Sequence, residues 1–375
     1  MNNKLETLTI KASNAIFLSD IHFGIRSSSE EWQDNIKSYF YDWFIPYLKN
    51  IVKDNPNYFL AVLGDVYDDR KSIDINVNDM AIDIFEILGS ILPVYIINGN
   101  HDLSKKTNKG NTSLRTLSNI DGVTIIKEPT LLKIKFNNKI LSNIIAIPYL
   151  GDHAEENKVL LKYSEKTDYA FMHTDISQMK FDNGMTIVGA VDSSLYKGKI
   201  LSGHIHKRQE LNNVIYIGSP YQLKRSDIGN IKGIYSLDFK TKDISFYENN
   251  FSPIFHKILI EDFLKLGNVE RNEFLNNNYN DILIDEDNLR KYKMTNIYYI
   301  ANLSNAKRVM IVVIKSKHDI SVDNEKDYKE LSIEELINES INQLDIDDKS
   351  KERLINISST YIKSAENEQL EKMDA

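Results

Sequence analysis

Five short polar clusters follow one another along the sequence, and together they hold five of its eight histidines. Their ligand-type side chains are carboxylates, an amide and imidazoles, a mixed oxygen and nitrogen set. Such a set suits Mn, Fe, Zn, Ni or Co better than Ca, and it has no thiolate to select a soft metal ion. The sequence therefore predicts a transition-metal site. The clusters are Asp20-Ile21-His22, Gly64-Asp65-Val66-Tyr67-Asp68, Gly99-Asn100-His101-Asp102, a single His173, and Gly203-His204-Ile205-His206.

Each cluster comes directly after a short run of apolar residues. The runs are apolar at successive positions, which indicates strands that are buried on both faces. In layered α/β folds, the loops at the carboxyl ends of such strands converge on one crevice, so side chains that are distant in sequence can meet around one ligand. Gly64, Gly99 and Gly203 suit the sharp turns or close backbone approaches expected there. The predicted strands are residues 15–19, 58–63, 94–98, 169–172 and 200–202.

Other segments show patterns that would complete a layered fold. Apolar residues recur at helical spacing in residues 30–55, where Pro46 predicts a kink, and again in residues 75–88. After the last cluster, three short strands are predicted, which would complete a second sheet. These strands are residues 214–217, 233–239 and 243–247.

The chain is long enough for two domains and a tail. The first domain is predicted to span residues 1–252, because the character of the sequence changes at Ser252 and Pro253. A small α/β cap is predicted for residues 253–318, from strand patterns at 255–260 and 308–315 with a helical stretch between them. Residues 319–375 form the predicted tail.

The order of the clusters resembles the order of the motifs in one protein family. The patterns D-x-H, G-D-x-x-D, G-N-H-D, a single H and G-H-x-H look like those of the calcineurin-like metallophosphoesterases over about the first 220 residues. Within that superfamily, the G-D-V-Y-D form, the ligand spacing and the long carboxyl-terminal extension most resemble SbcD/MRE-type DNA repair nuclease subunits, in particular the nuclease subunit of phage recombination endonucleases. The resemblance implies an α/β fold: a four-layer α/β/β/α sandwich with a small α/β cap and a helical tail.

The resemblance also implies a ligand set for two divalent metal ions, with Mn²⁺ expected and Mg²⁺ as the alternative. Two such ions lower the pKa of a water molecule to roughly 7 and neutralise charge on the phosphate oxygens. Asp65 would bridge the ions. One ion would be held by Asp20, His22, Asp65 and His206, and the other by Asp65, Asn100, His173 and His204.

Two further residues are implied to be catalytic. In the family, the histidine at the position of His101 faces the leaving-group oxygen, which it protonates or stabilises. In the related phosphoprotein phosphatases, the aspartate at the position of Asp68 orients that histidine, so Asp68 is expected to hold His101 and raise its pKa. Archaeal and eukaryotic MRE nucleases tend to have histidine in place of Asp68.

Some of these residues also have simpler structural interpretations. A single histidine after an apolar strand, such as His173, is more often a hydrogen-bonded structural residue, although its place before the G-H-x-H region favours a ligand. Asp102 is expected to cap its own turn. His153, His256 and His318 lie outside every motif and are predicted to be structural or at the surface.

Charge is unevenly distributed along the chain. Residues 319–375 contain 16 acidic and 7 basic residues, and the remainder contains 38 acidic and 39 basic residues. The body therefore does not repel a polyanion, whereas the tail is a poor DNA contact. Basic residues beside the motifs are candidates for holding backbone phosphates, with ordinary solvated loops as the alternative. The candidates are Arg70, Lys105, Lys106, Lys109, Lys207 and Arg208, together with Lys224 and Arg225.

The tail is predicted to form two amphipathic helices. Ser332 and Glu335 form a capping box before the first apolar stripe. The stripes could fold back on the body, but family members use helices after the cap to bind the coiled-coil base of an SMC-like ABC-type ATPase. Docking to such a partner is therefore expected. The docking candidates are Leu336, Ile337, Leu354 and Ile355.

The chain has no cysteine and no uninterrupted apolar run of the roughly 18 residues that a membrane-spanning helix needs. A cytoplasmic protein is expected, with a phage gene expressed in a bacterial host as one origin.

The expected function is that of a metal-dependent DNA nuclease, the hydrolytic subunit of an ATPase–nuclease complex that processes DNA ends and contains a homodimer of this chain. The alternatives are a stand-alone phosphomonoesterase or cyclic-nucleotide phosphodiesterase, and a non-catalytic scaffold.

Overall fold

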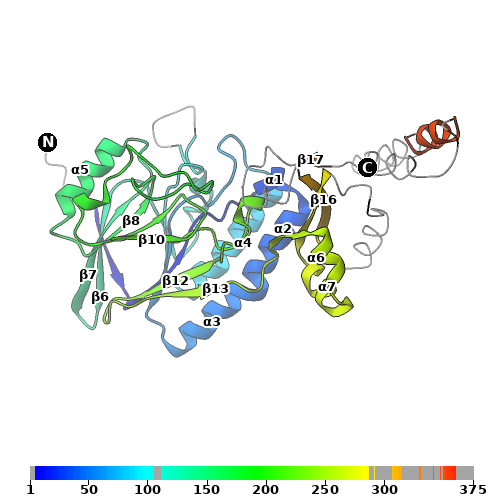
Figure 1. Ribbon diagram of the computed structural model, residues 1–375. Helices are drawn as coiled ribbons and strands as arrows, with labels where there is room; N and C mark the ends of the chain where they lie inside the picture. Colours follow the sequence, from blue (N-terminus) through cyan, green and yellow to red (C-terminus); the bar gives the residue numbers. More distant parts are fainter. Residues whose placement is uncertain are drawn as a thin grey trace. The chain divides into compact units, whose positions relative to one another are not determined.

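A computed structural model describes residues 5–104, 111–286, 291, 306–314, 329–330, 341, 347 and 349–359. The chain divides into two compact units, Met1–Ser252 and Pro253–Ala375. Both units contain helices and sheets (Figure 1). Unit 1 contains all five polar clusters.

One sheet of unit 1 has six strands, and its four adjacent strands β2, β3, β4 and β5 are parallel. The other two strands are antiparallel to their neighbours. Three of the predicted strands lie side by side in this sheet, and each is followed by a polar cluster. The order is β13 (Ile244–Glu248), β12 (Gly233–Asp238), β2 (Asn14–Leu18), β3 (Tyr58–Val62), β4 (Val94–Ile97) and β5 (Val123–Ile126).

The second sheet of unit 1 has seven strands and carries the last two polar clusters. Its strands β7, β8, β9 and β11 run parallel to one another. β1 is parallel to β6, whereas β6 is antiparallel to β7 and β10 is antiparallel to β11. The order is β1 (Thr7–Lys11), β6 (Thr130–Phe136), β7 (Lys139–Ile147), β8 (Tyr169–His173), β9 (Lys199–Gly203), β11 (Val214–Tyr216) and β10 (Gln209–Leu211).

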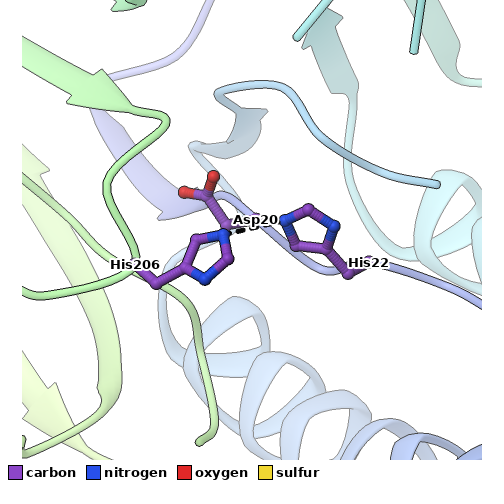
Figure 2. Close-up of side chains that lie close together, drawn as sticks. All are labelled: Asp20, His22 and His206. Carbon is purple, nitrogen blue, oxygen red and sulfur yellow. Dashed lines mark hydrogen bonds between the residues drawn. The ribbon is translucent and has the colours of Figure 1, made fainter. Parts of the chain in front are cut away.

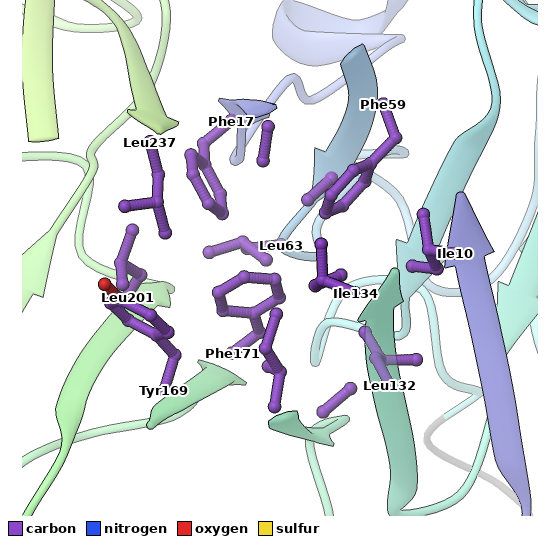
Figure 3. Packing of buried hydrophobic residues seen from close by; sticks show 14 of the residues in the cluster. Ile10, Phe17, Phe59, Leu63, Leu132, Ile134, Tyr169, Phe171, Leu201 and Leu237 are labelled. Carbon is purple, nitrogen blue, oxygen red and sulfur yellow. The ribbon is translucent and has the colours of Figure 1, made fainter. Parts of the chain in front are cut away.

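The two sheets pack face to face through a shared apolar core (Figure 3). Phe17 of β2 and Phe171 of β8 meet edge to face, with ring centroids 5.1 Å apart. Phe59 of the first sheet and Leu201 of the second lie in the same cluster. Because β2 is followed closely by Asp20 and β8 ends at His173, this core fixes the distance between the two sets of loops.

Helices cover the outer faces of both sheets (Figure 1). Leu160 and Tyr163 of α5 pack with buried residues of β7 and β8, including Ile145 and Ala170. On the six-stranded sheet, neighbouring residues such as Ile16 and Phe17 are both buried, so the face turned away from the core is also covered. Unit 1 is thus a four-layer α/β/β/α sandwich, as predicted. Its helices are α1 (Ile25–Ser28), α2 (Glu30–Ser38), α3 (Ile45–Asp54), α4 (Ile75–Ile91) and α5 (His153–Tyr163).

The predicted helix 30–55 is present, but its middle is unusual. A π-helical segment, η1 (Tyr39–Phe44), joins α2 to α3, and Pro46 stands in the first turn of α3. Because proline has no amide hydrogen to donate to the preceding turn, the widened π segment lies where the regular α-helical bonding is interrupted. Short 3₁₀ turns occur at η2 (Ser113–Leu117), η3 (Ser193–Leu195) and η4 (Arg225–Asp227).

Unit 2 contains a smaller sheet, and Phe263, Leu275, Ile282 and Ile311 contribute to its apolar core. Its first three strands are parallel, and β17 pairs antiparallel with β16. Since β17 falls inside the segment predicted to be tail, this sheet extends beyond the predicted end of the cap at residue 318. Residues 349–359 are helical. The elements are β14 (Phe255–Leu259), α6 (Ile260–Lys265), α7 (Asn268–Leu275), β15 (Tyr279–Asp285), β16 (Arg308–Ile314) and β17 (Lys329–Glu330).

Candidate metal centre

The five polar clusters meet because each lies at the carboxyl end of a strand in unit 1. The loops after β2 and β3 are joined by backbone hydrogen bonds from Asp20 to Gly64 (3.0 Å) and from His22 to Asp65 (3.1 Å). The loop after β9 joins them, since the amide of His204 donates to the Asp20 carboxylate at 3.1 Å. Ligand candidates from both sheets therefore surround one small volume.

The first group of converging side chains contains Asp20, His22 and His206 (Figure 2). The Nε2 atoms of His22 and His206 are 3.0 Å apart. Oδ2 of Asp65 lies 3.8 Å from the same His22 nitrogen. These are the four residues expected to hold one metal ion.

The second group contains Asp65, His173 and His204. His173 Nε2 lies 3.3 Å from Asp65 Oδ2 and 2.9 Å from Asn100 Oδ1. The same amide oxygen lies 2.7 Å from His204 Nδ1. These are the four residues expected to hold the other ion, and Asp65 belongs to both sets.

The outward-facing nitrogens of three of these histidines offer a test of whether the residues fit metal ions. Histidines that bind metals almost always donate their other ring N–H to a carboxylate or a carbonyl. His22 Nδ1 lies 2.9 Å from Asp68 Oδ1, His173 Nδ1 lies 2.6 Å from the carbonyl of Leu63, and His204 Nε2 lies 3.0 Å from Asp175 Oδ1. In each ring the second nitrogen therefore points into the centre, so the residues fit a pair of cations.

The backbone at the centre is held in unusual conformations. Four of the candidate ligands have positive φ angles, although none is glycine: Asp20 (53°), His22 (54°), Asp65 (52°) and His204 (97°). Left-handed conformations of such residues persist only when the surrounding structure imposes them, and they cluster at functional sites. Gly64 has a φ of 86°, and a Cβ there would collide with the ring of His173. Only glycine fits at this position.

The electrostatics of the centre favour a bound cation. Burial alone would raise the pKa of Asp65, but His173, His22 and His101 outweigh it and hold that pKa well below its ordinary range. Burial alone would lower the pKa of His173, but the charges of Asp65 and Asp20 outweigh it and raise the pKa to about 9. Protons on the imidazoles thus balance the buried carboxylates, a balance that divalent cations can take over.

His101 lies at the edge of the centre and is half-buried. Its amide donates to Asp65 Oδ1 at 2.7 Å, and its Nδ1 lies 2.5 Å from the backbone carbonyl oxygen of Asp68. Its ring meets that of His22 edge to face, with centroids 4.9 Å apart. Burial lowers the pKa of His101 below its ordinary value, although Asp65 opposes this.

Asp68 contacts two histidines of the centre in different ways. Its carboxylate contacts His22, a candidate ligand, whereas His101 is held by the Asp68 backbone carbonyl. His22, Asp68 and His101 form one cluster of ligand-type side chains, and the bond to the Asp68 backbone opposes the lowering of the His101 pKa by burial.

Asp102 does more than cap its own turn. Its Oδ2 accepts from the amide of Gly99 at 2.9 Å, as predicted for a turn. Its Oδ1 accepts from the amides of Val66 and Tyr67, at 3.0 and 3.2 Å, in the preceding motif. Burial, together with the nearby charge of Asp65, raises the pKa of Asp102 to about 6. This carboxylate ties the loop that carries Asp65 to the loop that carries Asn100.

The predicted phosphate-binding residues differ in their contacts. Lys207 is exposed beside His206, and Arg70 is half-buried close to Asp68. The guanidinium of Arg208 lies over the ring of Phe246, 4.3 Å from its centroid, and donates to the hydroxyl of Tyr235 at 3.4 Å, so it is already engaged. Lys224 pairs with Asp182 at 2.9 Å. Lys105, Lys106 and Lys109 lie outside the described residues, and η4 contains Arg225.

The docking candidates in the tail are only partly within the described residues. Leu354 is exposed and Ile355 is half-buried in the helix 349–359. Leu336 and Ile337 lie outside the described residues. Ile341, from the first predicted stripe, is buried. No helix in the described part of the chain is both long and apolar enough to cross a membrane.

The histidines outside the motifs have structural contacts where they are described. His153 begins α5, with Nδ1 3.0 Å from the buried carboxylate of Glu156. His256 meets Phe274 edge to face in unit 2, with centroids 4.8 Å apart. His318 lies outside the described residues.

Comparison with known families agrees with this geometry. The family model described as calcineurin-like phosphoesterase matches residues 14–208, which include all five clusters. The chain belongs to this family. The match begins at β2 and ends just after the G-H-x-H cluster, so it covers the ligand-bearing loops of both sheets.

Three known proteins are similar to this chain, each over a different length. "Exonuclease subunit 1" of Enterobacteria phage T4 is 27% identical over 346 residues, covering 90% of this chain and 95% of that protein. "DNA double-strand break repair protein Mre11" of Methanococcus maripaludis is 24% identical over 374 residues, covering 88% and 91%. "Putative phosphoesterase 078R" of Invertebrate iridescent virus 3 is 25% identical over 227 residues, covering 56% and 58%. The first two similarities cover more of the chain than unit 1 contains, so they reach into unit 2.

Two acidic residues at the centre escaped sequence reasoning. Asp175 faces His204, and Asp182 lies 3.7 Å from Nδ1 of His206. Asp175 follows His173 by two residues. A carboxylate so close in sequence to a candidate ligand was the signal that could have identified it. Asp182 lies in a loop with no motif of its own, so nothing in the local sequence distinguishes it.

Proposed function

We propose that this phosphoesterase is a metal-dependent DNA nuclease, the nuclease subunit of a complex with an SMC-like ABC-type ATPase. The observation that carries the proposal is the sharing of Asp65 between two ligand groups, one with Asp20, His22 and His206 and the other with Asn100, His173 and His204. When bound, two divalent cations supply an activated water molecule and neutralise charge on the phosphate. The similarity to an exonuclease subunit and to a double-strand break repair protein supports DNA as the substrate.

In this mechanism the protein positions the reacting groups and provides a proton donor. The carboxylates of Asp20 and Asp65 and the inward-facing imidazole nitrogens would hold the cations. His101 stands beside Asp65, and its Nδ1 faces a carbonyl oxygen, which fixes the proton on that nitrogen. Its Nε2 is then free to meet the leaving-group oxygen. An anionic phosphate beside the ring favours the protonated imidazole, so substrate binding prepares His101 to donate.

The other parts of the chain are assigned roles within the same proposal. The cap in unit 2 contacts DNA, and the acidic helical tail docks on the ATPase partner through apolar residues that include Leu354 and Ile355. The nuclease works as a homodimer in the complex, uses Mn²⁺ with Mg²⁺ as a second choice, and acts in the cytoplasm of the cell that expresses it. Arg70 and Lys207 are the described basic side chains best placed to hold phosphates next to the clusters.

Purified full-length protein, incubated with end-labelled single- and double-stranded DNA in Mn²⁺ and then in Mg²⁺, tests the proposal. DNA should be cleaved, and EDTA should abolish the cleavage. Asp65→Ala should lose both metal binding and cleavage because it removes the shared carboxylate. Hydrolysis of phosphate monoesters or cyclic nucleotides without cleavage of DNA would instead establish a stand-alone phosphoesterase. Metal binding without hydrolysis of any ester would establish a scaffold.

A further inference from the structure

Lys232 and Asp227 form a buried ion pair next to the last ligand loop. Their side chains are 3% and 2% exposed, and Nζ of Lys232 lies 2.8 Å from Oδ1 of Asp227. Charged pairs this deep are uncommon, because removing both groups from water is costly unless hydrogen bonds satisfy them. The partners of this pair therefore indicate what it holds in place.

All three hydrogen bonds of the Lys232 ammonium are directed at specific acceptors. Besides Asp227, it donates to the carbonyl oxygen of His206 at 2.7 Å and to Oγ of Ser219 at 3.0 Å. The amide of Ser219 donates to the same His206 carbonyl at 3.1 Å. The backbone of a candidate metal ligand is thus fixed by a buried cation from a segment that contributes no ligand.

Asp227 completes this cage on the other side. Its Oδ2 accepts from the amides of Leu223 and Lys224, at 2.8 and 3.2 Å, which closes the turn that leads into η4. The carboxylate therefore holds the turn with one oxygen and the ammonium with the other. Movement of the turn is thereby coupled to the position of His206.

The same segment also reaches the first motif. The hydroxyl of Tyr221 is buried and donates to the carbonyl of Ile21 at 2.7 Å, between Asp20 and His22. The ring of Tyr221 is held edge to face against Tyr39 of η1, with centroids 5.0 Å apart. One short segment thus fixes the backbone on both sides of the first ligand group.

We propose that Lys232, Asp227 and Tyr221 are positioning residues for one metal ion of the pair, the ion held by Asp20, His22, Asp65 and His206. Their hydrogen bonds reach the backbone of His206 and of Ile21. The second ligand group is fixed by other contacts, since Leu63 holds His173 and Asp175 faces His204. The hydrogen bonds of the cage therefore act directly on the first ligand group and not on the second. This inference rests on the proposed two-metal site and is independent of which phosphate ester is cleaved.

The variants that test this inference must avoid leaving a buried charge unpaired. Lys232→Met alone would strand the Asp227 carboxylate, and partner loss of this kind is strongly destabilising. The double variant Lys232→Met/Asp227→Asn removes both charges and keeps an amide oxygen for the two turn amides. Tyr221→Phe is a milder second test, because it deletes only the hydroxyl that contacts Ile21. Asp168→Asn is the control: Asp168 also accepts two hydrogen bonds, from Ser142 Oγ at 2.8 Å and from the amide of Asn143 at 3.1 Å, but it is exposed and lies just before β8, at the end of that strand opposite the ligands.

The measurement is titration of the metal-free full-length protein with Mn²⁺, with free Mn²⁺ followed by its EPR signal. Loss of a residue that orients a metal ligand typically weakens metal affinity about 10- to 100-fold. We expect the double variant to bind one Mn²⁺ that much more weakly while the other keeps its affinity within about threefold. Tyr221→Phe should weaken the binding of the same ion by a smaller factor. Asn100→Ala impairs the second site. In that background, the double variant should weaken the binding of the one Mn²⁺ that still binds tightly.

Two outcomes would overturn the inference. Equal weakening of both ions would show that the segment supports the centre only through general stability. Unchanged affinities in both the double variant and Tyr221→Phe would show that the cage does not act on the metals. If the double variant fails to fold, Tyr221→Phe alone decides. Failure of the proposed two-metal site is distinguishable, because the unmodified protein would then bind fewer than two Mn²⁺.

Discussion

Asp102 offers a direct test of how the ligand loops are held together. Its carboxylate is 1% exposed and accepts three backbone amides, those of Gly99, Val66 and Tyr67. Asp102→Ala would remove the two oxygens that accept from these three amides, in a site that is closed to solvent. The loop that carries Asp65 and the loop that carries Asn100 would then lose a direct connection.

The size of the effect follows from the number of amides left without partners. Each unsatisfied buried donor costs about 1–3 kcal/mol. Because the cavity left by the carboxylate admits some water, we expect a total loss near the lower end, about 3–5 kcal/mol for the three amides. This is a large part of the roughly 5–15 kcal/mol by which domains are stable. Asp102→Asn should lose less, because its amide keeps one accepting oxygen.

Urea unfolding in EDTA, followed by tryptophan fluorescence, measures this loss. Both tryptophans, Trp32 and Trp43, lie in unit 1, so the signal reports the unit that contains the loops. Asp152→Ala is the control: Asp152 also accepts two backbone amides, at the start of α5, but it is exposed. It should cost about 1 kcal/mol, as for other helix caps. A loss below about 1 kcal/mol for Asp102→Ala would refute the reasoning.

Further predictions concern other parts of the molecule. His101→Ala should keep both metals yet slow DNA cleavage by roughly two to four orders of magnitude, as for a general acid; loss of metal, measured by mass spectrometry, would make His101 a ligand. Asp175→Ala should weaken one Mn²⁺ about 10- to 100-fold, because it frees the outer nitrogen of His204; unchanged titration would contradict this. Truncation after Leu331, which retains β17, should keep cleavage of short single-stranded DNA and abolish binding to the ATPase partner in pull-down assays. A large loss of thermal stability in that variant would assign the tail to the fold of the chain itself.

The strands that carry the ligands were predictable because their signal is local. β2, β3, β4, β8 and β9 are built around short apolar runs, and each begins and ends within about one residue of the predicted position. By contrast, β15 contains Asn280 and Asp281, whose burial depends on neighbouring strands that the local sequence does not specify. β6, β7 and the helix α5 were likewise not predicted, although β6 alternates between buried and less buried positions along its sequence.

The candidate ligands were predictable for a related reason, since each belongs to a short motif of recognisable order. The contacts behind them were not. The contact of the Asp68 carboxylate with His22 depends on rotamers and loop geometry, which no spacing encodes. Asp102 shows both cases at once: its bond to Gly99 follows from the turn, whereas its bonds to Val66 and Tyr67 join segments more than 30 residues apart. Lys232 meets His206 only through the fold.

The positive φ angles of Asp20, His22, Asp65 and His204 bear on how this protein can evolve. Such conformations cost on the order of 1 kcal/mol each for residues other than glycine. Glycine at Asp65 would relieve that local strain while abolishing the shared ligand. Natural selection for catalysis must therefore continually oppose substitutions that make the metal-free protein more stable. In lineages where hydrolysis is no longer needed, these four positions should be among the first to drift, and towards glycine or asparagine rather than at random.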